Sequence, residues 1–161
     1  MFGSHDEDAL SSQLNLVAKW QPRSIAAEQY RMAATRLVLL TEGRRSTVLE
    51  VTSALKGEGK TTSVVNLGYT LARNLGKKTL LIDCDFSHPA LHEYVNKSAW
   101  GGLIELLDGE ASLENCLSTI DEVPCSILPI GRMGEDINEL TRIQQLKTVL
   151  PKIRMNFDYV I

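Results

Sequence analysis

The amino-acid sequence predicts an α/β fold, with a mostly parallel sheet and helices on both of its faces. The first observation is the order of four segments. β-Branched residues dominate 47–53, a glycine-bearing loop follows over 54–59, a helical apolar pattern covers 60–75, and a second apolar run covers 79–84. This is the order of a βαβ unit. The second observation is that 79–84 is almost continuously apolar, which is typical of a strand buried on both faces of a parallel sheet.

The remaining segments predict further elements of the same fold. Ser24 is placed to cap a helix whose apolar residues continue to Leu40, and Gly76 is placed to end the helix over 60–75. Apolar spacing also predicts short helices over 102–107 and 112–117, a strand over 126–130, a helix over 137–150 that Pro151 ends or kinks, and a strand over 157–161.

Length and composition indicate one globular domain. The chain has 161 residues, of which 43% are hydrophobic and 23% charged, and these values exclude a disordered chain or a coiled-coil rod. We interpret 1–23 as a polar N-terminal arm or linker and 24–161 as the domain. The net charge of −3 argues against a nucleic-acid partner. Three cysteines without close pairing, and the lack of a signal-peptide pattern, favour reduced thiols in the cytoplasm.

The segment 54–61 reads Ala-Leu-Lys-Gly-Glu-Gly-Lys-Thr and is nearly the phosphate-binding pattern G-x-x-x-x-G-K-[ST], with Ala54 in place of the first glycine. Gly57 and Gly59 let the backbone turn so that successive N–H groups face phosphate oxygens. The loop leads into a helix N-terminus, which favours anions. Lys60 is placed to reach the outer phosphates, and the hydroxyl of Thr61 to bind Mg²⁺. A strand before the loop and a helix after it support a nucleotide-binding P-loop. The expected nucleotide contacts are Lys56, Gly57, Glu58, Gly59, Lys60, Thr61 and Thr62.

Asp83 and Asp85 lie at the C-terminal end of the next strand, the edge where open α/β sheets bind their ligands. Two residues apart in an extended segment, their side chains point the same way. We expect Asp83 to support the Mg²⁺ and Asp85 to act as a co-ligand or as a base toward an attacking hydroxyl. The predicted catalytic residues are therefore Lys60, Asp83 and Asp85, and the predicted metal ligands are Thr61 and Asp83.

These motifs resemble those of the bacterial tyrosine kinases of capsule and exopolysaccharide synthesis, within the MinD/ParA-like class of P-loop ATPases. Residues 57–62 resemble the family's Walker A core, 81–85 its second acidic motif, and 28–31 the helix motif that packs subunits together. The connecting segments over 102–113 and 128–131, and the strand over 157–161, are also similar. The resemblance covers about 25–161.

The resemblance implies a P-loop, ATP- and Mg²⁺-dependent protein tyrosine (auto)kinase that regulates capsule or exopolysaccharide synthesis and export. It also implies a homo-oligomer, ATP and ADP as ligands, and a cytoplasmic location at the inner face of the cell membrane, held there by a membrane adaptor or by a segment missing from this chain. Two alternatives stay open: a MinD/ParA-like regulatory ATPase switch without kinase activity, and a structural module of an export complex.

The sequence departs from the family pattern at several positions. The family's Walker B aspartate would follow Ile161, so we expect a chain truncated before it. The tyrosine-rich tail that these kinases phosphorylate is absent, and the four tyrosines are scattered. The signature lysine of MinD-like ATPases would fall at Leu55, which favours the kinases. The last arginine of the helix motif would fall at Ala34.

Two further features are interpreted from their positions alone. Arg44 and Arg45 precede the first strand and form either a solvated basic turn or a contact with a neighbouring subunit or lipid head groups. Cys84, between the two aspartates, is expected to be a buried thiol.

Overall fold

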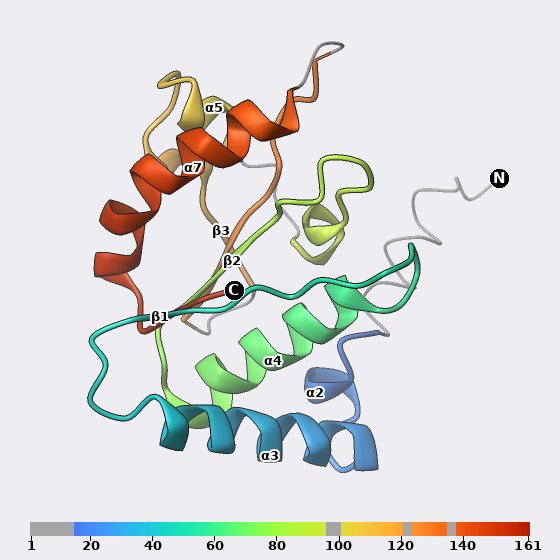
Figure 1. Cartoon of the computed structure of the whole chain (residues 1–161). Helices are drawn as coiled ribbons and strands as arrows, with labels where there is room; N and C mark the ends of the chain where they lie inside the picture. Colours follow the sequence, from blue (N-terminus) through green and yellow to red (C-terminus); the bar gives the residue numbers. More distant parts are fainter. Residues whose placement is uncertain (1–14, 96–100, 121–123, 135–137) are drawn as a thin grey trace, which may run out of the picture.

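A five-stranded sheet forms the centre of the computed structural model, which describes residues 15–95, 101–120, 124–134 and 138–161 (Figure 1). The strand order is β1-β5-β2-β4-β3. The first four of these strands pair in parallel, and β3 adds an antiparallel edge beside β4. The strands are β1 (Thr47–Val48), β2 (Thr79–Ile82), β3 (Ser118–Thr119), β4 (Cys125–Leu128) and β5 (Tyr159–Val160). The predicted fold class is therefore confirmed.

Helices cover both faces of the sheet (Figure 1). One face carries α2 (Val17–Trp20), α3 (Ile25–Leu40), α4 (Lys60–Leu75) and the 3₁₀ turn η1 (Leu91–Tyr94). The other face carries α5 (Leu103–Leu107), α6 (Leu113–Cys116) and α7 (Glu139–Ile153), which continues into η2 (Arg154–Asn156).

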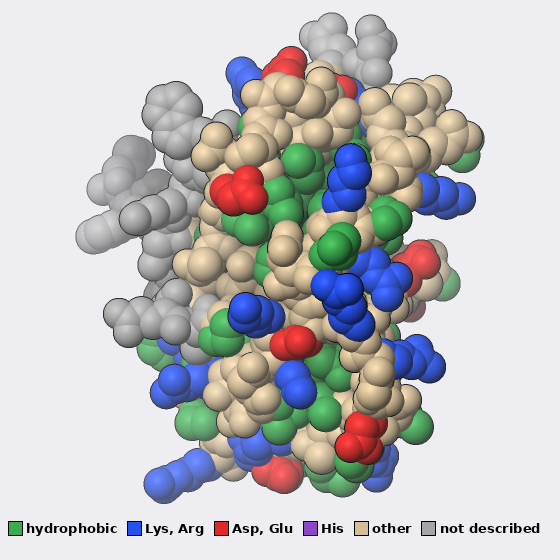
Figure 2. Space-filling view, turned by 90° about the vertical axis from the view of Figure 1, so that its left-hand side faces the viewer, with side chains coloured by type: hydrophobic (Ala, Val, Ile, Leu, Met, Phe, Trp, Pro, Cys, Tyr) green, Lys and Arg blue, Asp and Glu red, His purple; other side chains and the backbone are tan. Residues whose placement is uncertain are grey.

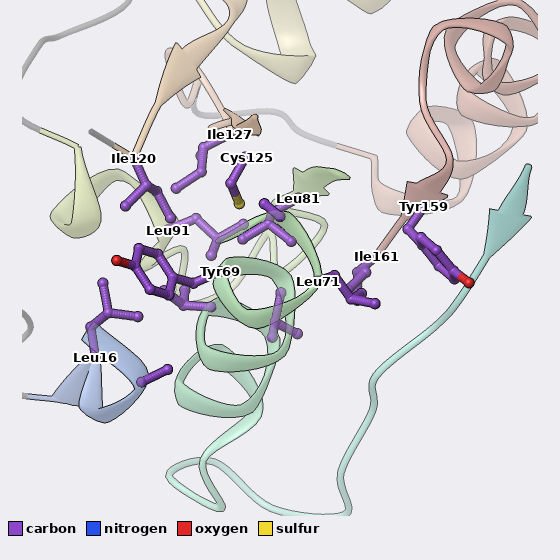
Figure 3. Close-up of a cluster of buried hydrophobic side chains, with 14 of the residues drawn as sticks. Leu16, Tyr69, Leu71, Leu81, Leu91, Ile120, Cys125, Ile127, Tyr159 and Ile161 are labelled. Carbon is purple, nitrogen blue, oxygen red and sulfur yellow. The ribbon is translucent and has the colours of Figure 1, made fainter. Parts of the chain in front are cut away.

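The two faces have separate hydrophobic cores, and β2 contributes to both. Leu81 packs with Leu71 of α4 and Ile127 of β4 in the first core (Figure 3). Leu80 faces the other way and packs with Leu103 of α5 in the second core. All five side chains are fully buried. The alternation of successive side chains along a strand explains why a continuously apolar strand is needed at this position.

Most predicted elements appear where expected. Ser24 caps α3, since its Oγ accepts a hydrogen bond from the N–H of Ala27, and Gly76 ends α4 in the left-handed conformation. The first strand is shorter than predicted, because its neighbour β5 pairs only with Thr47 and Val48. Pro151 lies inside the last turn of α7 rather than ending it, and Ile137 lies outside the described residues.

Part of the predicted N-terminal arm packs against the domain. Leu16 is 4% exposed and belongs to the first core (Figure 3). The amide of Asn66 in α4 holds this segment: its Oδ1 accepts from the N–H of Ala18 at 2.9 Å, and its Nδ2 donates to the carbonyl of Asn15 at 2.8 Å. Residues 1–14 of the arm lie outside the described residues.

A buried carboxylate, Glu105, fastens α5 to the loop after β4. Its Oε2 accepts from the N–H of Gly102 at 2.7 Å, and its Oε1 accepts from the N–H of Arg132 at 2.9 Å and from its Nε at 3.1 Å. Burial alone would raise the pKa of Glu105, but these donors outweigh it and the pKa lies below its usual value.

Candidate nucleotide-binding site

The glycine-bearing loop turns sharply into α4. Gly57 and Gly59 have φ of +83° and +85°, a backbone region that residues with a Cβ rarely adopt. Gly59 is the N-cap of α4 and has no side chain to accept the N–H groups of the first turn. Those N–H groups therefore suit an external anion. Glu58 supports the turn, since its Oε2 accepts from the N–H of Leu55 at 3.0 Å.

Asp83, at the end of β2, is 5% exposed and organises the loop that follows it. Its Oδ1 accepts from the N–H of Asp85 at 3.1 Å, and its Oδ2 accepts from the N–H groups of Ala90 and Leu91, each at 2.9 Å. Burial raises the pKa of Asp83, and the three hydrogen bonds only partly offset this effect. Both carboxylate oxygens are thus engaged with backbone.

Asp85 faces the P-loop lysine. The distance from Lys60 Nζ to Asp85 Oδ2 is 3.4 Å, with both side chains about one-third exposed. Asp85 Oδ1 also accepts from the N–H of His88 at 2.9 Å. Burial opposes ionisation of Asp85, but His88 and the Lys60 ammonium outweigh it, and the pKa of Asp85 is lowered. The fold therefore brings a cation and an ionised carboxylate together at the start of α4.

A cavity of about 480 Å³ opens beside these groups, at the C-terminal ends of β1, β2 and β5. Lys60, Thr61, Asp83 and Asp85 all line it. The other expected contacts do not line it: Lys56, Gly57, Glu58, Gly59 and Thr62. Ligands of open α/β sheets bind at this edge.

One wall of the cavity comes from α7, which the sequence analysis did not assign to the site. Glu139, Ile143, Leu146 and Leu150 line this wall, and Ser87 after β2 donates to Glu139 Oε1 at 3.4 Å. The helical spacing of the apolar residues predicted a helix over 137–150. It carried no signal that this helix would border a cavity.

The three cysteines are free thiols, and Cys84 lines the cavity. Cys84 is exposed, so the expectation of a buried thiol was wrong: β2 ends at Ile82, two residues before it. Cys116 and Cys125 are buried free thiols, and burial raises the pKa of Cys125 to about 12. Among the residues that the structure describes, no group of three or more His, Cys, Asp or Glu side chains could hold a metal ion by itself.

The AAA domain family matches residues 46–161, which include the loop, both aspartates and all five strands. The chain belongs to this AAA domain family. It is also similar to bacterial tyrosine-protein kinases, as its motifs predicted.

The relatives of this chain include a polysaccharide transport protein and a tyrosine-protein kinase. The chain is 34% identical over 170 residues to the succinoglycan biosynthesis transport protein ExoP of Rhizobium meliloti (strain 1021), covering 99% of this chain and 22% of ExoP. It is 31% identical over 149 residues to the tyrosine-protein kinase YwqD of Bacillus subtilis (strain 168), covering 92% of this chain and 62% of YwqD.

A solved structure shares the fold. The kinase domain of VpsO is 30% identical, with a TM-score of 0.67, over 86% of this chain and 71% of that domain. The chain thus spans most of one solved kinase domain but less than two thirds of the curated relatives ExoP and YwqD. In the part of the chain that the structure covers, no helix is long and apolar enough to cross a membrane.

Proposed function

We propose that this chain is the ATP- and Mg²⁺-binding domain of a protein tyrosine (auto)kinase that regulates capsule or exopolysaccharide synthesis. The observation that carries the proposal is the meeting of Lys60 with Asp85, 3.4 Å apart, at the start of α4 and beside the cavity. A lysine on a P-loop stabilises the negative charge of transferring phosphates. A nearby ionised carboxylate suits the acceptance of a hydroxyl proton.

In this proposal Lys60 and the N–H groups of residues 57–62 bind the phosphates of ATP or ADP. Asp85, whose pKa is lowered, stays ionised at neutral pH and holds the Lys60 ammonium at the cavity until phosphate oxygens compete for it. Asp83 positions Asp85, because its carboxylate binds the N–H groups at both ends of the 85–91 loop.

The residues present fit a magnesium ion that arrives with a nucleotide rather than one held by protein alone. The Thr61 hydroxyl lines the cavity, and Mg²⁺ prefers one or two protein oxygens together with phosphate oxygens and water. Asp83 has both oxygens in backbone hydrogen bonds, which suits support of the ion through water. When bound, the ion would neutralise charge on the phosphates.

The proposal includes assembly with further copies and with a membrane adaptor at the inner face of the cell membrane. Glu28 and Arg31, in the segment that resembles the subunit-packing motif, form an ion pair within α3. Arg31 also donates to the carbonyl of Pro22 at 2.8 Å. Subunit packing through this motif would have to exchange these contacts for contacts with a neighbour.

Phosphotyrosine detection after incubation with ATP and Mg²⁺ tests the kinase proposal on the full-length gene product. We expect a phosphotyrosine signal that Lys60→Met abolishes, because the outer phosphates lose their ammonium. Arg23→Met, a change of the same kind at an exposed position outside the site, is the control and should leave the signal intact. Phosphate release without phosphotyrosine would contradict the kinase proposal.

A regulatory ATPase switch is the second candidate, and the burial of the tyrosines favours it. Tyr69 and Tyr159 are buried, and Tyr30 and Tyr94 are only partly exposed. None of the four tyrosines of this chain is therefore a freely accessible phosphate acceptor in the described fold. The kinase proposal needs an acceptor on another segment or another protein, whereas an ATPase switch needs none.

A further inference from the structure

The end of the sheet opposite the cavity is where β1, β2 and β5 begin. Six basic side chains lie there, on the three segments that lead into these strands. Two precede β1, two precede β2, and two lie at the end of α7 and in η2, ahead of β5. We call this set the basic edge: Arg44, Arg45, Lys77, Lys78, Lys152 and Arg154.

Backbone hydrogen bonds join the three loops into one surface. The N–H of Thr47 donates to the carbonyl of Asp158 at 2.8 Å, and the N–H of Asp158 donates to the carbonyl of Lys78 at 2.8 Å. Arg154 Nη2 donates to the carbonyl of Ser46 at 3.0 Å. The sheet order β1-β5-β2 therefore brings together basic residues that are more than 100 positions apart in the sequence.

The positive charge of the basic edge is poorly compensated. Lys77 is partly exposed and the other five side chains are exposed. None of the six takes part in an ion pair with another residue in the described ranges. Glu42 and Asp158 are the acidic residues on the same loops. Figure 2, which views the left-hand side of Figure 1, shows many Lys and Arg side chains over this face, with Asp and Glu side chains lying among them. The excess of six basic over two acidic residues on these segments contrasts with the chain's net charge of −3.

Large apolar side chains are exposed beside these cations. Leu39 and Leu40 end α3 directly before the first basic loop, and they are 65% and 79% exposed. Met155 follows Arg154 and is 60% exposed. Exposed leucine and methionine cost free energy in water, and their grouping with lysine and arginine is typical of surfaces that rest in the headgroup layer of a bilayer.

We propose that the basic edge, together with Leu39, Leu40 and Met155, docks this domain on a bilayer that contains anionic phospholipids. Cations on long side chains attract a negatively charged membrane surface without needing a shaped pocket. The three apolar side chains give the surface something to insert, and they would gain nothing from a purely polar acidic partner.

This placement would set the orientation of the nucleotide site. β2 begins next to Lys78 on the basic edge and leads to Asp83 at the cavity. A strand rises about 3.3 Å per residue, so the cavity lies roughly 16 Å farther from the bilayer than the basic edge. The site would therefore face away from the lipid and stay open to nucleotide and to protein substrates.

Vesicle co-sedimentation of the 161-residue chain tests the proposal without relying on any catalytic activity. The vesicles are phosphatidylcholine alone, or phosphatidylcholine mixed with phosphatidylglycerol. We expect binding to the anionic vesicles only, and weaker binding as salt shortens the screening length from about 10 Å toward about 3 Å.

Two matched pairs of variants distinguish binding through the basic edge from binding that depends only on overall charge or hydrophobicity. Arg44→Gln with Lys152→Gln should weaken the partition coefficient about fivefold for each charge removed. Lys19→Gln with Arg23→Gln, near the opposite end of α3, removes the same charge and should change it little. Leu40→Ser should weaken binding that survives at high salt, whereas Ile25→Ser, 83% exposed at the start of α3, should not.

Circular dichroism of each variant checks that the fold is retained, as expected at exposed positions. Equal losses for the basic-edge pair and its control pair would overturn the proposal. So would an absence of binding to anionic vesicles. A third outcome would assign the basic edge to an acidic protein instead. In it, polyglutamate displaces the chain from anionic vesicles as effectively as added anionic vesicles do, and Leu40→Ser has no effect on binding.

Discussion

Replacing Glu105 by Gln tests whether one buried carboxylate holds α5 and the loop after β4 together. The change keeps the size of the side chain but leaves only one oxygen. That oxygen can accept from the N–H of Arg132 or from the N–H of Gly102, but not from both in the present geometry. One buried N–H then faces the amide NH₂ of the new side chain.

The expected loss follows from these contacts. A buried donor left without an acceptor costs about 1–3 kcal/mol, and loss of the charge weakens the remaining hydrogen bond by roughly half. We therefore expect Glu105→Gln to lower the free energy of unfolding by about 2–4 kcal/mol. The ion pair with Arg132 adds little, because the Arg132 side chain is 84% exposed.

Urea unfolding followed by circular dichroism measures the loss, with Arg132→Gln as the matched variant. Arg132→Gln keeps the backbone N–H and should cost less than about 1 kcal/mol. Equal losses in the two variants would refute the reasoning, since they would assign the stabilisation to the exposed ion pair.

The same carboxylate gives a pH dependence. The pKa of Glu105 is lower in the folded protein than its usual 4.5. Its ionisation therefore stabilises the fold above pH 4.5, and this contribution is lost as the pH falls through that value toward the folded pKa. The stability difference between the wild type and Glu105→Gln should narrow over this range. A difference that is constant with pH would contradict the assignment.

Three further predictions concern the site and the core. Lys60→Met should weaken the binding of Mg²⁺-nucleotide more than tenfold, as measured by calorimetry. The free energy of unfolding should change by less than about 1 kcal/mol, because the lost ion pair with Asp85 is partly exposed to solvent. Unchanged affinity would exclude a contact between Lys60 and phosphate. Asn66→Leu should remove the hydrogen bonds that hold residues 15–20 and lower the free energy of unfolding by about 2–4 kcal/mol. The segment should then be cleaved by protease. A segment that stays resistant to protease would show that apolar packing alone holds it. Gly102→Ala should destabilise more than Gly134→Ala, because a Cβ at position 102 would clash with the backbone of Gly131, whereas a Cβ at position 134 meets no neighbour. Equal unfolding midpoints in urea would refute this.

The sequence predicted the P-loop and the acidic strand end because their chemistry depends on local order. Gly57 and Gly59 are needed for a backbone turn, and Lys60 and Thr61 follow at fixed positions along the chain. Asp83 and Asp85 follow a strand whose apolar character marks it as central. That Lys60 and Asp85 meet depends on β2 lying beside α4, and this could be inferred only through the expected parallel sheet.

Other features depended on contacts between distant segments, which no local pattern encodes. Asn66 is an ordinary polar residue of a helix in the sequence, but in the fold its amide binds the backbone of the arm. Glu105 becomes a buried anchor only because the loop after β4 returns to it. The exposure of Cys84 follows from where β2 ends.

The sequence by itself determined the class of fold and the residues that suit phosphate chemistry, because a glycine turn, a helix N-terminus and an apolar strand are local properties of the chain. Only the tertiary structure decided which side chains share a surface. Parallel strand order brings the ends of β1, β2 and β5 to one cavity, and it brings the starts of the same strands to the opposite, basic edge. Both outcomes follow from pairing between strands that are far apart in sequence. The free energy of that pairing depends on both strands together, so neither segment predicts it alone.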